Sequence, residues 1–142
     1  MKKLLIASLF AAAFSVACSS QPVETESTPV PDAHTAEMAL DWNGTYEGVL
    51  PCASCEGIKT TLTLNNDKTY LLNEVYLTNK PGQNNFNTTG KFEFDAQQAS
   101  LIRLDEKADK RVFFVGENML EARDAETGKA IEGNMNYILN KK

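Results

Sequence analysis

The chain has few of the residues on which enzyme active sites and metal centres depend. Its 142 residues include a single histidine and only three cysteines. The histidine, His34, lies in a polar stretch that contains prolines, so a Ser-His-Asp triad and a four-ligand zinc site are both unsupported. The sequence also has no Gly-rich phosphate loop and no paired carboxylates of a catalytic type. We therefore expect a protein that is not an enzyme.

Positive charge is also scarce. The sequence has 14 Lys and Arg residues against 19 Asp and Glu residues, which gives a formal net charge of −5. An acidic chain is repelled by nucleic acid phosphates and by anionic lipid headgroups. Nucleic acid is therefore not expected as a partner, and attachment to a membrane has to come from something other than surface charge.

No apolar run is long enough to cross a bilayer. The longest, Leu4 to Phe14, is shorter than the roughly 20 residues that a transmembrane helix needs. It follows Lys2 and Lys3, and small residues lie at its end, a layout typical of a secretory signal. Residues 1–17 are therefore predicted to be a signal peptide.

The four residues Ser15-Val16-Ala17-Cys18 resemble a bacterial lipobox, in which the cysteine is acylated and becomes the new N-terminus. We therefore expect lipid attachment at Cys18, through acyl chains such as palmitate that anchor the chain to the membrane. Ser19 and Ser20 follow, where an aspartate would favour the inner membrane. The expected location is the outer membrane, lipid-anchored and facing the periplasm.

Residues 18–40 are polar and contain three of the five prolines. Such a segment cannot bury enough apolar surface to offset the entropy of ordering. We expect a disordered, flexible tether, with a short helical turn at 35–40.

Residues 41–142 are predicted to form one all-β domain. Apolar and polar residues alternate with period two, as in Thr60, Leu62 and Leu64, and turn residues separate the runs. An antiparallel up-and-down barrel is the simplest closure, since it leaves no exposed edge, and a two-sheet sandwich is the alternative. The predicted strands are 44–50, 58–64, 69–77, 88–95, 99–105, 110–115, 118–123 and 134–140.

Two of the three cysteines form a Cys-x-x-Cys pair, Cys52 and Cys55, between the first two predicted strands. Three interpretations remain open: a structural disulfide, favoured by an oxidising periplasm; a redox switch; or a Cu(I) site, since paired thiolates suit Cu(I). Thioredoxin-like catalysis is disfavoured because no helix N-terminus follows and Glu56 places a negative charge beside the pair.

Other notable side chains have structural explanations. Met119 and Met135 lie in alternating strands and are expected in the core rather than as metal ligands. Trp42, just before the first strand, is expected to close one end of the barrel.

The run Pro51-Cys52-Ala53-Ser54-Cys55-Glu56-Gly57-Ile58 resembles the N-terminal domain of the NlpE family, envelope lipoproteins linked to copper tolerance and stress signalling. Asp67–Tyr70, Gly90–Phe92 and Asn136–Leu139 extend the resemblance. It implies a lipocalin-like β-barrel that acts as a sensor or interaction module and has an envelope stress-signalling protein as partner. Full-length members carry a second, OB-like domain. Because this chain stops at Lys142, we expect a single-domain form without that domain's part in signalling.

Two alternative functions remain. A lipocalin-like carrier of a small apolar ligand would have an open cavity lined by Tyr70, Phe92 and Phe94, whereas a packed interior favours the interaction module. A Cu(I)-buffering protein would bind the metal at Cys52 and Cys55.

Overall fold

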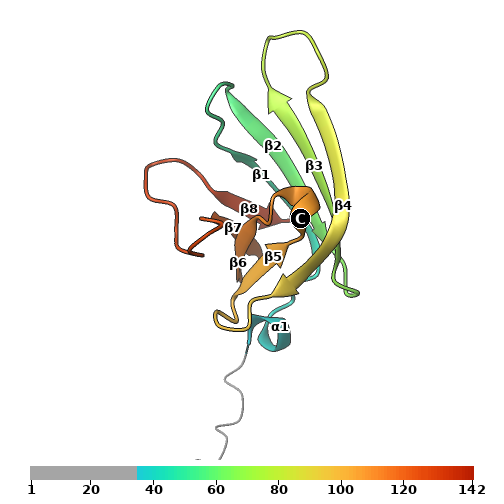
Figure 1. Cartoon of the computed structure of the whole chain (residues 1–142), viewed down its shortest axis with the longest axis vertical. Coiled ribbons are helices and arrows are strands. Elements are labelled where there is room, and N and C mark those ends of the chain that lie inside the picture. Colours follow the sequence, from blue (N-terminus) through green and yellow to red (C-terminus); the bar gives the residue numbers. More distant parts are fainter. Residues whose placement is uncertain (1–34) are drawn as a thin grey trace, which may run out of the picture. The chain divides into compact units, whose positions relative to one another are not determined.

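A computed structural model describes residues 35–142, which hold a closed antiparallel barrel of eight strands (Figure 1). Each strand pairs with the next one along the chain, and β8 returns to pair with β1. The predicted antiparallel up-and-down barrel is thereby confirmed. The elements are α1 (Ala36–Ala39), β1 (Gly44–Leu50), β2 (Gly57–Leu64), β3 (Thr69–Leu77), β4 (Asn85–Phe94), β5 (Leu101–Leu104), the 3-10 turn η1 (Glu106–Ala108), β6 (Val112–Gly116), β7 (Met119–Arg123) and β8 (Ile138–Lys141).

The predicted strands match the observed ones closely, except at the fourth and the last. The fourth was predicted to begin at residue 88, but β4 begins at Asn85. The last was predicted to begin at residue 134, but β8 begins at Ile138. The Asn136 side chain accepts a hydrogen bond from the Ile138 N–H (3.1 Å), which makes a local turn before the strand. The prediction for Met135 is therefore wrong, since this residue precedes the strand and is 61% exposed.

The barrel interior is filled by side chains from all eight strands. Alternate residues of β2 and β3 point inward, as the period-two pattern predicted. The two buried tyrosines have partners for their hydroxyls: Tyr46 donates to the Trp42 carbonyl (2.7 Å) and Tyr70 donates to the Asp105 carboxylate (2.7 Å). Burial raises the pKa of Tyr46 to about 12. The largest fully buried side chains are Tyr46, Tyr70, Phe92, Phe113, Leu62, Leu64, Leu72, Ile102, Leu104, Leu120, Leu139 and Val112.

α1 lies at one end of the barrel (Figure 1), and Trp42 belongs to the core cluster that contacts it. The Trp42 ring packs edge-on against Phe92 and Phe94, with ring centroids 5.7 and 5.5 Å apart. Its Nε1–H donates to the Glu37 carbonyl of α1 (3.0 Å). The predictions of a helical turn and of a tryptophan that closes one end are confirmed.

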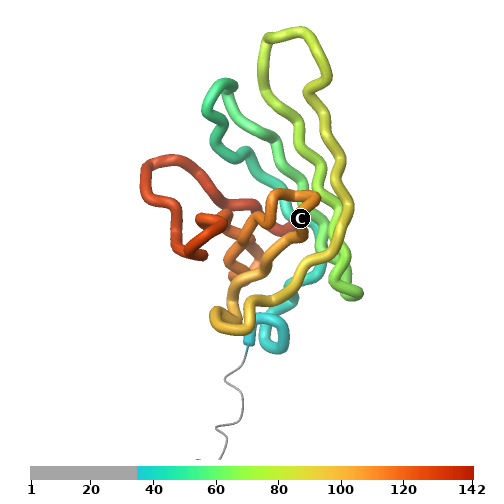
Figure 2. Tube along the Cα trace, in the orientation of Figure 1, coloured from blue at the N-terminus to red at the C-terminus, as the bar shows by residue number. Residues whose placement is uncertain are grey.

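The two halves of the barrel differ in length. β4 pairs with β3 from Asn85 to Lys91 but with β5 only from Phe92 to Phe94. The β3–β4 hairpin consequently extends well beyond β5 and β6 (Figures 1 and 2). The barrel is closed and packed around the α1 end and open at the other end, where the 51–56 and 78–84 loops lie.

The seam between β1 and β8 closes the barrel. Tyr46 pairs with Lys141, and the Lys142 N–H donates to the Thr45 carbonyl (2.9 Å). An ion pair between Lys141 and Asp41 (2.9 Å) lies beside it. The two ends of the barrel domain are therefore neighbours in space.

Several predictions fall outside the described residues. These are the signal peptide 1–17, the lipid site Cys18 and most of the tether 18–40. Between residues 35 and 142, no helix has the length and apolar character needed to cross a membrane.

Candidate functional site

The loop from Pro51 to Glu56 joins β1 to β2 at the open end of the barrel. Cys52 and Cys55 form a disulfide in this loop, with Cα atoms 5.3 Å apart, which supports the disulfide among the three interpretations that the sequence left open. The Glu56 N–H donates to the Leu77 carbonyl at the end of β3 (3.0 Å), which holds the loop against the sheet. Gly57 fits closely where β2 begins, because a Cβ there would lie 2.5 Å from the Val49 side chain, which would have to move.

Solvent reaches this loop from outside. Ala53, Ser54 and Glu56 are exposed, and both cysteines are half-buried. The cysteines lie between two strands and not at a helix N-terminus, so they lack the helix dipole that activates thioredoxin-like thiols. An accessible disulfide of this kind can exchange with a soluble thiol.

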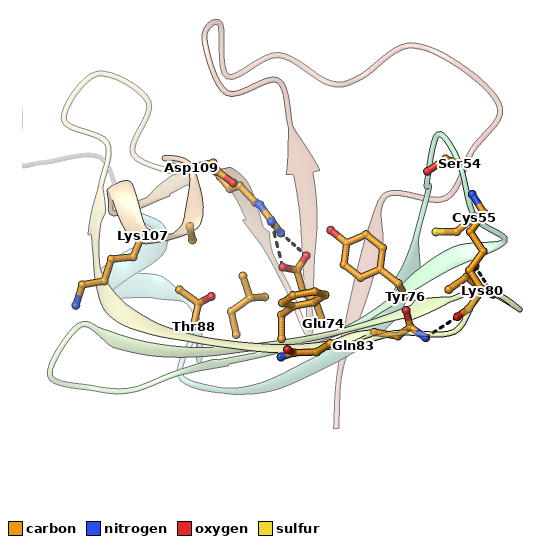
Figure 3. A pocket seen from close by; sticks show the side chains of 15 residues that line it. Ser54, Cys55, Glu74, Tyr76, Lys80, Gln83, Thr88, Lys107 and Asp109 are labelled. Atoms are coloured by element: carbon orange, nitrogen blue, oxygen red, sulfur yellow. Dashed lines mark hydrogen bonds and ion pairs between the residues drawn. The ribbon is translucent and has the colours of Figure 1, made fainter.

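Ser54 and Cys55 also border a hollow of about 460 Å³ at the open end (Figure 3). The inner faces of β3 and β4 form one wall, and η1 and Arg111, which lies just before β6, form the other. The polar floor centres on Glu74, which is only 7% exposed. The residues that line the hollow include Leu72, Glu74, Tyr76, Phe86, Thr88, Ala108 and Arg111.

Arg111 makes a two-pronged ion pair with Glu74 in this hollow (Figure 3). The Nη1–Oε1 and Nη2–Oε2 distances are 2.6 and 3.1 Å. Burial acts to lower the pKa of Arg111, but the hydrogen bonds and charge of Glu74 outweigh it, and the net shift is upward. The pair separates the hollow from a smaller apolar one of about 260 Å³ that Leu50, Ile58, Val112 and Phe113 help to line.

This ion pair was not predicted from the sequence. One signal was available, because Glu74 occupies an inward position in the alternation Tyr70, Leu72, Glu74, Tyr76. A charged residue at such a position needs a buried partner. Nothing in the sequence identified Arg111 as that partner.

Asp105 fixes η1 against β4 at the point where β5 ends. Its carboxylate accepts hydrogen bonds from the N–H groups of Lys91 (2.9 Å) and Lys107 (3.2 Å) and from the Tyr70 hydroxyl. These hydrogen bonds hold the pKa of Asp105 below its usual range, and the bond from the Lys91 N–H has the largest effect, ahead of the bond from the Tyr70 hydroxyl. Gly90 is needed here, since any Cβ would collide with the Asp105 carboxylate.

The donor atoms of the loop do not fit Cu(I) in this state. Both sulfurs are in the disulfide, so neither is the thiolate that Cu(I) prefers. Among residues 35–142, no group of three or more His, Cys, Asp or Glu side chains is placed to hold a metal ion.

Comparison with known proteins gives the family. Residues 46–134 match the model of the NlpE N-terminal domain. The chain belongs to the NlpE family. It is 34% identical over 122 residues to lipoprotein NlpE of Escherichia coli K12, which is 86% of this chain and 49% of that protein. The chain therefore spans about half the length of this curated relative.

Two solved structures are similar in fold to this NlpE-family chain. A putative lipoprotein from Shewanella oneidensis is 47% identical with a TM-score of 0.68, and the match covers 76% of this chain and 95% of that one. The E. coli NlpE structure, described as the Cpx pathway activator, is 37% identical with a TM-score of 0.54, over 66% of this chain and 48% of that one. The family resemblance of the Cys-x-x-Cys segment is thus confirmed.

The Cys52–Cys55 bond should contribute only modestly to stability. The two cysteines are three positions apart, and closing so short a ring is worth about 2 kcal/mol in the chain-entropy account. We expect reduction to lower the free energy of unfolding by about 2 kcal/mol or less, measured by urea unfolding with and without dithiothreitol. A Cys52→Ser, Cys55→Ser variant should not respond to the reductant. A loss near the full stability of the domain would show instead that the bond holds the fold together.

Proposed function

We propose that this NlpE-type lipoprotein is a sensor and interaction module of the bacterial envelope. It is held at the outer membrane through Cys18 and faces the periplasm. The redox state of Cys52 and Cys55 alters the 51–56 loop, and an envelope stress-signalling protein reads the changed surface. The observation that carries the proposal is an accessible disulfide loop at the open end of a barrel whose other half is packed.

The packed interior favours an interaction module over a carrier. Tyr70 and Phe92, expected to line a carrier's cavity, are buried in the core, and Phe94 packs against it. Core side chains at native packing density leave no room for a ligand. The hollow at the open end is bounded by other residues and contains an ion pair, which an apolar ligand would have to desolvate.

The proposed switch is a thiol–disulfide exchange. A dithiol reductant supplies two electrons and two protons, becomes a disulfide itself, and leaves Cys52 and Cys55 as two free thiols. β1 and β2 are paired along their whole length up to Leu50 and Ile58, and the disulfide is no part of that pairing. We therefore expect reduction to change the loop and its surface without unfolding the barrel.

The similarity to E. coli NlpE supports a role in stress signalling, since that relative is described as the Cpx pathway activator. Copper buffering has less support, because Cu(I) capture by Cys52 and Cys55 would first require reduction of their bond.

A reporter experiment tests this function. The chain is expressed in E. coli that lacks its own NlpE and carries a reporter of the Cpx pathway. We expect the wild-type chain to raise the reporter and the signal to change when dithiothreitol is added. The Cys52→Ser, Cys55→Ser variant should give a signal that the reductant does not alter. Equal responses from both chains, at equal protein levels, would contradict a role for the pair.

A further inference from the structure

The first half of β4 has a free edge. On one side β3 pairs with β4 from Asn85 to Lys91, but on the other side β5 reaches only Phe92 to Phe94. The Tyr76 N–H donates to the Asn84 carbonyl and the Phe92 N–H donates to the Lys68 carbonyl. Hydrogen-bonding positions alternate along an antiparallel strand. The backbone groups of Asn85, Asn87 and Thr89 therefore point outward, away from β3.

Most of these outward groups have no partner within residues 35–142. The Asn85 carbonyl accepts from the Gln83 side chain (3.2 Å), and the edge is closed again at Lys91 by Asp105. No hydrogen bond to the backbone of Asn87 or Thr89 is present on this side. The side chains of Asn85 and Asn87 are held by Asn73 at 2.7 and 2.8 Å, so they do not fold over the edge.

This edge also lacks the usual protection against strand addition. Free edges in native proteins commonly carry a charged residue, a proline or a bulge. The run from Asn85 to Gly90 has no charged residue and no proline. Its register with β3 is unbroken from Asn85 to Lys91, so the strand is regular over its whole free length.

The hollow lies directly beside the free edge. Phe86 and Thr88, the inward residues of this segment, line it. Phe86 is 43% exposed and packs edge-on against Tyr76, with ring centroids 5.6 Å apart. A strand added to β4 would place every second side chain over this hollow, because side chains alternate between the faces of a sheet.

Charge around the hollow favours an acidic occupant. Lys107 lies at one end and Lys80 at the other (Figure 3). Neither lysine has an ion-pair partner in the described part of the chain, and the nearby Glu74 is already paired with Arg111. Asp109 is the remaining acidic residue of the lining. A second copy would bring a β4 edge without any acidic residue, so it does not complement these lysines.

We propose that an extended segment of a partner polypeptide adds to β4 as a further strand. It pairs with the outward backbone groups of Asn85, Asn87 and Thr89 and points an acidic side chain into the hollow. This inference rests on the proposed function, for which it names the surface that the partner occupies. Main-chain hydrogen bonds then supply affinity, and the hollow supplies specificity.

A synthetic strand peptide tests the edge. The probe is capped Thr-Val-Thr-Val-Glu-Val-Thr-Val-Thr, titrated into nitrogen-15-labelled residues 18–142 that carry Cys18→Ala. We expect the amide resonances of Asn85, Asn87 and Thr89 to shift and their hydrogen exchange to slow. Two forms of the peptide, N-methylated on alternate residues, serve as the control. Only one edge of the peptide faces β4, so one form should bind and the other should not.

Protein variants separate the backbone from the side chain. Asn87→Pro removes the outward N–H and no backbone hydrogen bond to β3, and we expect about tenfold weaker binding. It also loses the side-chain bond from Asn73, as Asn87→Ala does, so the two variants differ only at the backbone. Asn87→Ala keeps the N–H and should bind as the wild type does. A peptide with lysine in place of glutamate should bind several-fold more weakly. If Asn87→Pro disturbs the fold, the N-methylated peptides still decide the question with the wild-type edge.

Several results would overturn the proposal. These are no shift at millimolar peptide, equal binding of both N-methylated forms, or shifts confined to other strands. Protection of the Asn87 amide that grows with protein concentration would assign the edge to a second copy. Protection that disappears when residues 18–34 are removed would assign it to this chain. The peptide result is independent of the Cpx reporter, so a silent reporter with normal peptide binding would count against the proposed function alone.

Discussion

Replacing Glu74 with leucine will lower the free energy of unfolding by about 3 kcal/mol. Removing one member of a buried ion pair costs about 3–5 kcal/mol, because the other charge stays behind without a partner. We expect the lower end of this range, since the Arg111 side chain is 30% exposed and regains some water. Urea unfolding followed by the fluorescence of Trp42, which is buried in the core, measures the change.

A double variant distinguishes the pair from its separate charges. Replacing both partners, as Glu74→Leu with Arg111→Met, leaves no uncompensated charge and should return the stability to within about 1 kcal/mol of the wild type. The exposed pair between Lys110 and Glu106 is the matched control, and Glu106→Ala should cost no more than about 1 kcal/mol. Equal losses from Glu74→Leu and Glu106→Ala would contradict the buried character of the first pair.

The position of the Glu74–Arg111 pair explains its expected contribution to the free energy of unfolding. Glu74 lies on β3 in the long half of the barrel, and Arg111 lies just before β6 in the short half. Glu74 lies opposite Phe86 of β4, and β4 pairs with β5 only from Phe92 onward. The ion pair therefore links the two halves where the strand ladder does not.

Changing Cys18 to alanine will move the protein from the membrane to the soluble fraction. The acidic barrel is not attracted to anionic headgroups, so attachment depends on the acyl chains that the cysteine is proposed to carry. Several acyl chains on one residue anchor a protein stably to a membrane, whereas a protein without acyl chains keeps only weak contact with the lipid surface. Membrane fractionation and labelling with radioactive palmitate measure the two effects together.

The matched control keeps the anchor and changes its destination. Ser19→Asp should remain lipid-labelled and membrane-bound but collect with the inner membrane on a density gradient. A Cys18→Ala protein that stays in the membrane fraction after a high-salt wash would contradict lipid attachment at this residue. A Ser19→Asp protein that stays in the outer membrane would contradict only the sorting assignment.

Much of the fold was predictable because period-two alternation is local. In β2, Leu62 and Leu64 point inward between polar neighbours, and that pattern alone gives the strand and its buried face. The start of β8 was harder to predict from the sequence. The Asn136 side chain accepts a hydrogen bond from the Ile138 N–H, and this local turn replaces the strand that the alternation predicts before residue 138.

The candidate site was predictable only in part. The spacing of Cys52 and Cys55 indicated two thiols close enough either to form a disulfide or to share a soft metal ion, and the structure has the disulfide. The free edge of β4 was not predictable, since it depends on where β5 leaves its neighbour. That point is set by Asp105, whose contacts with Lys91 and Tyr70 come from strands distant in sequence.

The β1–β8 seam makes the order of the strands along the chain replaceable. Because Lys142 bonds to Thr45 and Lys141 to Asp41, a short glycine-serine linker can join the two ends of the domain. The exposed 79–83 loop can then be cut to give a circular permutant with the same strand pairing. Its new N-terminus would lie at the open end. An anchor attached there would join the barrel beside the disulfide loop, and not at the α1 end where the described part of the chain begins.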